Sequence, residues 1–155
     1  MANTHALQFV AASSQSAHAA NSASLNITSD MTLECWVKHS TVTSQNFRMF
    51  NMDDQNTSGT YTFNFRYIGQ ISGNPVLDFN TTDQTGGTVS TVEVLWTPTV
   101  DVWYHYAFVY TASAGSGKFY INGVQQGTTQ TGLGTALYSG GAALTLGAYQ
   151  TGGNY

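Results

Sequence analysis

The segment Thr60-Tyr-Thr-Phe-Asn-Phe-Arg-Tyr67 decides the fold class of this chain. Aromatic side chains occupy every second position, and threonine, asparagine and arginine fill the positions between them. Successive side chains of a β-strand point to opposite faces of a sheet, so this alternation predicts a strand with one aromatic and one polar face. We expect the aromatic face, which includes Phe63 and Phe65, to lie in the core together with Phe119 or Tyr120.

Two other segments also predict strands. In Met31-Thr-Leu-Glu-Cys-Trp-Val-Lys38, one face carries Leu33, Cys35 and Val37, and we expect this face to be buried. In Trp103-Tyr-His-Tyr-Ala-Phe-Val-Tyr110, both faces are apolar or aromatic. A strand of that kind should lie centrally in its sheet and be covered on both sides.

Turn signals follow one another at short intervals along the chain. The clearest is Asn122-Gly123, because a type I′ hairpin needs positive φ at both central residues and Asn-Gly is its preferred pair. The strand before this turn, Lys118–Ile121, should pair antiparallel with Trp103–Tyr110 through a connection at Ala112–Gly117. The Gly- and Thr-rich stretch Gly127–Gly134 is expected to form a long surface loop.

Short strands between turns, with no sustained helical periodicity, predict an all-β fold. We therefore expect residues 1–155 to form one domain, a two-sheet antiparallel β-sandwich. The single cysteine allows no internal disulfide, so the core alone must hold this fold.

The composition excludes several classes of function. Charged residues make up 8% of the chain, and the net charge is -4 from four basic and eight acidic residues. Four basic residues are too few to form a phosphate-binding surface or a polybasic membrane anchor. We therefore expect no nucleic-acid partner. No apolar run approaches the ~18 residues of a membrane helix, and Met1–His5 has no signal-peptide character, so neither membrane insertion nor a secretion signal is expected.

Catalysis is not expected either. Glycoside hydrolysis needs two carboxylates about 5–10 Å apart. The only glutamates are Glu34 and Glu93, and Glu34 is more simply a polar strand residue beside Lys38. The Ser and His residues show no nucleophile-elbow pattern. We predict a protein that is not an enzyme, with glycoside hydrolysis as a remote alternative.

Three aromatic residues are candidates for sugar binding, which needs an aromatic platform with fixed polar groups beside it. Trp36 is the best platform because it stands on the polar face of its strand. Tyr138 and Tyr149, in late loop regions, are further candidates. The alternative for Trp36 is that it packs beneath a covering loop.

Calcium is the one ion that the sequence favours. Asp53 and Asp54 offer adjacent hard oxygen ligands between two predicted strands, and Asp30 is a further candidate ligand. No EF-hand spacing is present, so a solvated polar turn is the alternative. Other cofactors are not expected.

Six short motifs, taken in order, resemble laminin-G-like domains of the concanavalin A-type jelly-roll fold. They are Ala6-Leu-Gln-Phe9, Asn21-Ser-Ala-Ser-Leu25, Met31-Thr-Leu-Glu-Cys-Trp-Val-Lys38, Trp103-Tyr-His-Tyr-Ala107, Phe119-Tyr-Ile-Asn-Gly123 and Leu144-Thr-Leu-Gly147. The resemblance implies a lectin-like jelly roll that opens with a strand at residues 6–9. It also implies calcium at a loop rim and a structural role for the histidine at position 105. It is less specific for function, because this fold carries lectins, glycosidases, adhesion modules and virion proteins.

The family's usual final strand has no counterpart in this sequence, which reaches Thr151–Tyr155 where the Gly-rich loop before that strand would stand. We expect this to leave an open sheet edge beside Leu7–Val10 and Met31–Lys38. Open edges invite pairing with another chain. The protein should therefore not act as a free monomer. Its open edge or adjoining face should meet another copy of itself, a capsid protein of a virion, or residues beyond 155.

Two functions fit these observations. The first is a lectin-like module on a virion surface, as a capsid decoration or fibre domain, that serves assembly, glycan adhesion or both. A weakly charged surface suits a protein held in an assembly. The second is a carbohydrate-binding or adhesion module of a larger secreted or cell-surface protein, in an extracellular location.

Overall fold

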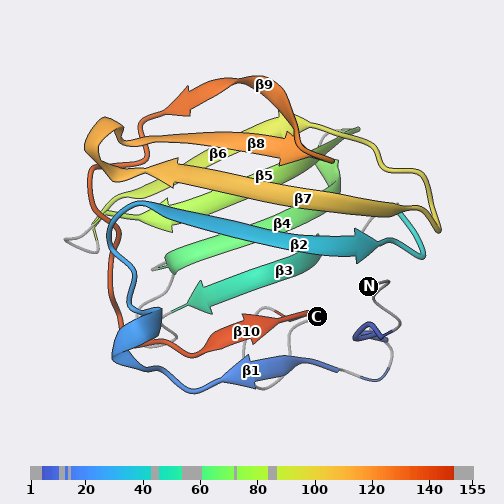
Figure 1. Ribbon diagram of the computed structural model, residues 1–155, viewed down its shortest axis with the longest axis horizontal. Helices are drawn as coiled ribbons and strands as arrows, with labels where there is room; N and C mark the ends of the chain where they lie inside the picture. Colours follow the sequence, from blue (N-terminus) through green and yellow to red (C-terminus); the bar gives the residue numbers. More distant parts are fainter. Residues whose placement is uncertain are drawn as a thin grey trace.

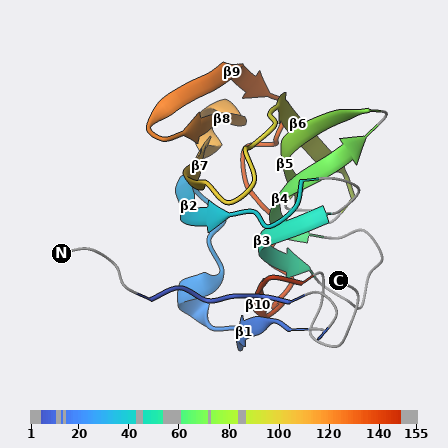
Figure 2. The ribbon, with the colours of Figure 1, turned by 90° about the vertical axis from the view of Figure 1, so that its right-hand side faces the viewer.

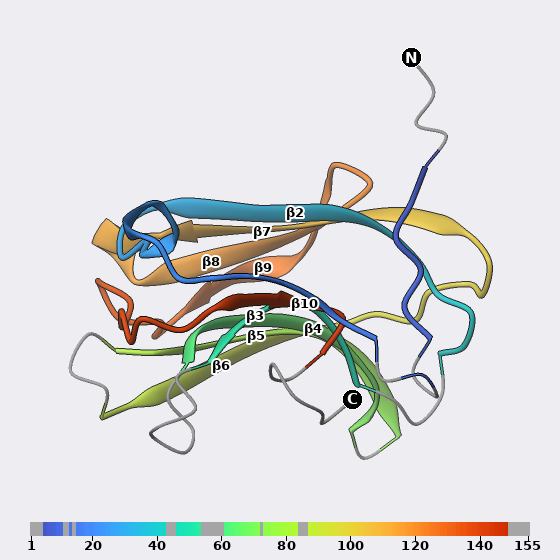
Figure 3. The ribbon, with the colours of Figure 1, turned by 90° about the horizontal axis from the view of Figure 1, so that it is seen from below.

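Two antiparallel sheets pack face to face in the computed structural model, which describes residues 5–10, 13, 15–42, 46–53, 61–71, 73–83 and 87–148 (Figure 1 and Figure 3). The larger sheet has six strands in the order β1-β10-β3-β4-β5-β6, and the smaller sheet has four in the order β2-β7-β8-β9. Every neighbouring pair of strands is antiparallel. The predicted two-sheet β-sandwich is confirmed.

The larger sheet consists of β1 (Ala17–Ala19), β10 (Leu144–Leu146), β3 (Asn46–Asp53), β4 (Tyr61–Ile71), β5 (Asn74–Thr82) and β6 (Val89–Leu95). The smaller sheet consists of β2 (Met31–Lys38), β7 (Trp103–Thr111), β8 (Ser116–Ile121) and β9 (Val124–Thr131). Two 3-10 helices, η2 (Ala23–Leu25) and η3 (Ala112–Ala114), join strands. Within the described part of the chain, no helix is long and apolar enough to cross a membrane.

The predicted strands agree closely with the observed ones. β2 has the predicted bounds, β7 is one residue longer, and β4 includes the predicted segment from Tyr61 onward. Thr60, its predicted first residue, lies outside the described residues. Alternation alone was sufficient to place these strands, because each has one face in the core.

β7 and β8 form the predicted antiparallel pair, with Phe108 opposite Phe119. Their connection is shorter than expected, because β8 already begins at Ser116, opposite Thr111. Gly117 is required at its place in β8: a Cβ atom there would lie 2.1 Å from the ring of Phe108. Only glycine leaves room for this ring between the sheets.

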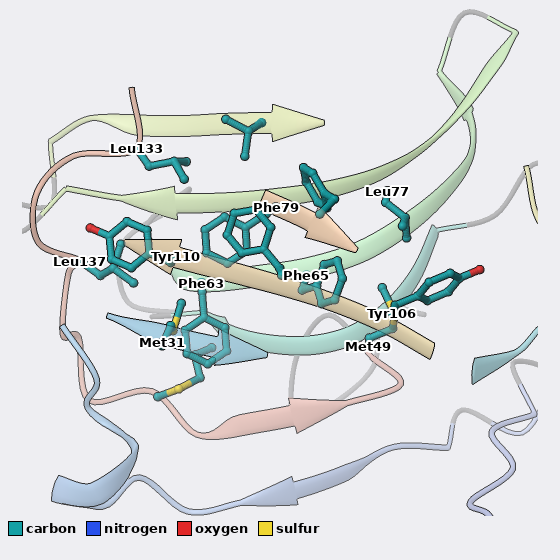
Figure 4. Packing of buried hydrophobic residues seen from close by; sticks show 14 of the residues in the cluster. Met31, Met49, Phe63, Phe65, Leu77, Phe79, Tyr106, Tyr110, Leu133 and Leu137 are labelled. Carbon is teal, nitrogen blue, oxygen red and sulfur yellow. The ribbon is translucent and has the colours of Figure 1, made fainter. Parts of the chain in front are cut away.

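Aromatic side chains from both sheets fill the core (Figure 4). Phe65 and Phe79 come from the larger sheet and Phe108 and Phe119 from the smaller one, and all four are fully buried. The rings of Phe79 and Phe108 stack across the sandwich with centroids 4.0 Å apart. The predicted burial of Phe63, Phe65 and Phe119 is confirmed.

The core-facing residues of β2 are only half-buried, although Leu33, Cys35 and Val37 do pack against the core. Their face was predicted correctly. Their partial exposure follows from the position of β2 at the edge of its sheet. Burial still raises the pKa of the Cys35 thiol to about 12, with Glu34 adding to the effect, so the thiol is protonated at neutral pH.

A buried polar chain links the end of β2 to β7. The indole Nε1–H of Trp96 donates to the Tyr106 hydroxyl over 3.0 Å, and that hydroxyl lies 3.1 Å from Nε2 of His39. Because indole is only a donor, the Tyr106 hydroxyl accepts from Trp96, and the tautomer of His39 decides which of the two groups donates in the second contact. Burial lowers the pKa of His39 to about 4.

Three expectations about exposure and loops are wrong. β7 is central in its sheet but is covered on one side only, since Trp103 on its outward face is 47% exposed. The expected loop Gly127–Gly134 instead continues β9 as far as Thr131, because it pairs with β8. The opening segment Leu7–Val10 forms no strand within the described residues 5–10, and its apolar side chains are exposed.

Candidate functional site

The outward side of the smaller sheet carries two exposed tryptophans. Trp36 on β2 lies directly opposite His105 on β7, and Lys38 lies opposite Trp103. Trp36 is 65% exposed and Trp103 47%. Cross-strand neighbours on one face lie about 5 Å apart, so these side chains form a continuous surface. We call this surface, together with Glu34, the aromatic face.

Polar groups stand beside both indole rings. The Trp36 and His105 rings are tilted, with centroids 5.3 Å apart, so the histidine flanks the indole and does not stack flat on it. Nε2 of His105 lies 3.5 Å from a carboxylate oxygen of Glu34, and Nζ of Lys38 lies 5.9 Å from the centre of the Trp103 ring. The face therefore combines flat apolar surface with a carboxylate, an imidazole and an ammonium group.

The backbone beneath this face is fixed. His105 donates its N–H to the side-chain oxygen of Asn122 over 2.9 Å, which ties β7 to the β8–β9 turn. Asn122 donates its own N–H to the carbonyl of His105 over 2.8 Å. Two hydrogen bonds between the same two residues thus join β7 to the β8–β9 turn beside the aromatic face.

Trp36 and Tyr138, two of the sugar-binding candidates, do not come together. Trp36 is not covered by a loop, so the alternative of a packed Trp36 is wrong. Tyr138 is half-buried and donates its N–H to the carbonyl of Thr82 at the end of the larger sheet, away from the aromatic face. Tyr149 lies outside the described residues.

Two of the calcium candidates, Asp30 and Asp53, occupy separate environments. Asp30 accepts the backbone N–H of Ala112 over 2.7 Å, and so holds the turn between β7 and β8. Asp53 is buried at the end of β3, opposite Tyr61, and Asp54 lies outside the described residues. Among the residues that the structure describes, no group of three or more His, Cys, Asp or Glu side chains is placed to hold a metal ion.

A second polar surface was missed in the sequence. Asn51, Asn64, Asn80 and Thr91 lie in register across β3, β4, β5 and β6, on the side of the larger sheet that faces away from the core. We call these four residues the polar row. Asn64 is fully buried, and neither atom of its amide has a hydrogen-bond partner within the described residues. Buried amides normally have partners, so Asn64 is an exception among the described residues.

An ion pair lies next to the polar row. Nε of Arg66 donates to the carboxylate of Asp78 over 2.7 Å, and Asp78 lies opposite Glu93. Burial raises the pKa of Asp78, and Arg66 opposes that rise. The alternation around Asn64 and Arg66 in β4 already predicted a polar face, but the register that lines up four strands is a long-range property.

The chain matches the family model of the concanavalin A-like lectin/glucanases superfamily over residues 12–155. The protein belongs to this superfamily. No curated protein matches the chain at a significant level.

Solved structures share the superfamily fold with this chain at low sequence identity. Domain 4 of AbnA, an extracellular arabinanase from Geobacillus stearothermophilus, in complex with arabinotriose, is 20% identical with a TM-score of 0.58, over 86% of this chain and 58% of that one. The CBM40 domain of a Ruminococcus gnavus IT-sialidase, bound to α2,3-sialyllactose, is 12% identical with a TM-score of 0.60, over 83% and 68%.

A third solved structure comes from a virus. The enzymatically active domain of tailspike protein 2 of bacteriophage CBA120 is 12% identical with a TM-score of 0.58, over 90% of this chain and 25% of that one. This chain also spans only 56% of a heptameric pentraxin from Limulus polyphemus. These likenesses show the fold.

The superfamily includes glucanases, so the positions of the carboxylates matter. Glu34 and Glu93 face outward from opposite sheets and cannot flank one bond. Glu93 instead has Asp78 as its cross-strand neighbour, a pairing that depends on the register between β5 and β6. The Asp78 carboxylate is buried and accepts a hydrogen bond from Arg66.

Proposed function

We propose that this domain is a non-catalytic carbohydrate-binding module whose aromatic face binds glycan. One observation carries the proposal: Trp36, on a rigid strand, exposes 65% of its surface beside a second exposed tryptophan. Large aromatic side chains left in water are unfavourable unless a ligand covers them. The apolar C–H face of a sugar ring is a suitable cover for an indole.

The polar groups of the aromatic face suit the hydroxyls of the same ligand. Glu34 accepts hydrogen bonds, Lys38 donates them, and His105 does either according to its tautomer. Glu34 lies 3.5 Å from His105, and its side chain remains 64% exposed and open to a ligand. Stacking with two or three such hydrogen bonds is the usual design of a site that fixes a sugar's orientation.

The likeness to domains solved with bound sugars supports this function. Both the arabinanase domain and the sialidase module have this fold and were solved with an oligosaccharide. Because their sequence identity to this chain is low, they do not indicate which sugar this chain binds. We therefore infer glycan binding as the class of function, with the ligand to be found by screening.

A glycan array followed by calorimetry tests the proposal. Trp36→Ala and Trp103→Ala should each weaken binding of the best glycan about tenfold, the effect of losing roughly 1.4 kcal/mol of stacking. The matched control is Leu95→Ala, because Leu95 is 68% exposed but lies on β6 of the other sheet. Equal binding by all four proteins would contradict the assignment to the aromatic face.

The polar row is the competing site for the same glycan, because Asn64 is buried without a partner among the described residues. Asn64→Ala, checked for folding by circular dichroism, should leave binding unchanged if the aromatic face is the site. Loss of binding in Asn64→Ala, with Trp36→Ala unaffected, would move the site to the larger sheet.

We propose the surface of a virion as the location of this module, with an extracellular protein as the alternative. Only 8% of the residues are charged, which suits a protein held in an assembly, and the tailspike domain shows that this fold occurs in a phage structural protein. Mass spectrometry of purified particles would detect the chain in a virion. Its presence only in the secreted fraction of a cell would favour the alternative.

A further inference from the structure

His39 is buried where β2 ends, directly after Lys38 of the aromatic face. Its ring lies between strands of both sheets, with the ring centroids of Tyr67, Phe47 and Tyr106 at 4.8, 5.2 and 5.8 Å. Nε2 lies 3.1 Å from the Tyr106 hydroxyl, whereas Nδ1 is buried and has no hydrogen-bond partner within the described residues. Both nitrogens of an imidazolium are donors, so protonation in this position would leave one donor buried and unpaired.

No charged side chain near the ring compensates for a positive charge there. The titratable residues on the core side of β2, β4 and β7 at this end carry no charge at acid pH: Cys35, Tyr67, Tyr104 and Tyr106. The neighbouring charged residues of β2 and β3 face outward, since Lys38 stands on the aromatic face and Arg48 is in register with Arg66 on the outer side of the larger sheet. Burial alone lowers the pKa of His39.

His39 also holds the connection from β6 to β7. Its carbonyl accepts the backbone N–H of Asp101 over 2.8 Å, and the hydroxyl beside its ring, that of Tyr106, accepts the indole N–H of Trp96 over 3.0 Å. Both donors belong to residues 96–102, the connection that Figure 1 and Figure 2 show beside the end of β2. The burial of one imidazole ring and the position of this connection are therefore linked.

The two linked segments lead directly into the aromatic face. Trp103 follows Asp101 by two residues, and Lys38 precedes His39 by one. Lys38 and Trp103 lie opposite each other in the β2–β7 pairing, with Nζ 5.9 Å from the centre of the indole ring. A displacement of His39 would therefore move this end of the aromatic face, whereas Trp36 lies two residues further inside β2.

We propose that His39 is an acid switch that releases the Lys38–Trp103 end of the aromatic face when its ring is protonated. The protonated ring needs water at both nitrogens, so the chain after Lys38 turns outward and the bond from Asp101 is lost. The neutral ring favours the buried arrangement and protons favour the released one, so falling pH shifts the population toward release.

The consequence for ligand binding rests on the proposed function. If the released arrangement binds no glycan, the apparent affinity falls in proportion to the fraction that remains buried. One pH unit below the midpoint of the switch, this amounts to about a tenfold loss. The module would then hold its glycan at neutral pH and release it in acid.

Hydrogen exchange without any glycan tests the switch itself. The Asp101 amide reports on the bond to the His39 carbonyl, and the amide of Phe65, in the central strand β4, reports on the core. We expect the protection of Asp101 to be lost with a midpoint near pH 4, while Phe65 stays protected. In His39→Phe and His39→Gln, which cannot titrate, Asp101 should stay protected throughout.

Two results would overturn the switch. Loss of protection at Asp101 and Phe65 together would show that acid unfolds the whole domain. A protected Asp101 amide, while the ring signals of His39 titrate, would show that the ring is protonated in place. Melting curves at pH 7 establish that both variants fold, and either variant serves as the control.

Calorimetry with the glycan selected on the array tests the consequence. At about pH 3, the wild type should bind about tenfold more weakly than His39→Phe, while the two proteins bind equally at pH 7. Titration of Glu34 affects both proteins alike, so their difference isolates His39. An equal pH dependence would contradict the switch. Absence of glycan binding by the wild type at pH 7 would contradict the proposed function instead, and hydrogen exchange alone would then decide on the switch.

Discussion

His39 shows how burial changes the chemistry of a single side chain. Its ring is enclosed beside Tyr106 and Phe47, and burial lowers its pKa to about 4 from an ordinary 6.5. The unfolded chain takes up a proton near pH 6.5, while the folded protein does so only near pH 4. Folding stability should therefore fall as the pH drops through this interval.

Replacing His39 by phenylalanine tests this linkage. We expect the wild type to lose about 3 kcal/mol more stability than His39→Phe between pH 7 and pH 4, because the shift spans about 2.5 units at 1.36 kcal/mol each. Urea unfolding at several pH values measures the difference. Parallel stability profiles for the two proteins would show that His39 is not held neutral by burial.

A substitution of Phe65 tests the assignment of the core, again at the scale of a single residue. It is fully buried, and its ring lies 6.2 Å from that of Phe108 across the sandwich. Phe65→Ala should cost about 3–5 kcal/mol of unfolding free energy, through lost burial and the cavity left behind. The exposed Leu95 is the control, since Leu95→Ala should change stability by less than about 0.5 kcal/mol. A loss below about 1 kcal/mol for Phe65→Ala would mean that the face was assigned backwards.

At the scale of elements, local sequence patterns predicted the strands well, but they did not predict which strands lie side by side. The alternation in Met31–Lys38 gave the bounds of β2, since a period of two needs no knowledge of partners. The register that aligns Asn51 with Asn64 and Asn80 depends on pairing between distant segments, so it was not predicted. The exposure of Trp36 has the same origin, because nothing in β2 itself reveals whether a loop covers its outer face.

The β8–β9 hairpin provides a testable prediction at the scale of elements. Asn122 and Gly123 have φ of 50° and 80°, as the Asn-Gly signal predicted. A Cβ atom at Gly123 would have no heavy atom within 4 Å, so only backbone strain opposes a larger residue. Gly123→Val should cost about 1–2 kcal/mol, and Gly123→Asn clearly less, because asparagine tolerates the left-handed region. Chemical unfolding of both variants makes the comparison, and equal losses would refute the conformational explanation.

At the scale of the whole molecule, the sandwich is closed along β6 and β9 and open along β2. The expectation that the protein does not act as a free monomer stays a prediction.

Calcium binding is the other whole-molecule prediction. If Asp53 and Asp54 hold the ion, calcium binds the folded state alone and raises the melting temperature by mass action. We expect an increase at millimolar calcium that magnesium does not reproduce and that Asp53→Asn removes. Differential scanning fluorimetry measures it, and an unchanged melting temperature would assign these residues to a solvated turn.

The indole N–H signals of the three tryptophans provide the most direct test of glycan binding by the aromatic face. In a nitrogen-15 NMR titration with the glycan selected on the array, the Trp36 and Trp103 signals should shift with ligand concentration. Trp96 is the internal control, because its indole is bonded to the Tyr106 hydroxyl. Its signal should stay in place. Unmoved Trp36 and Trp103 signals, with shifts confined to the side-chain amides of the polar row, would contradict the account.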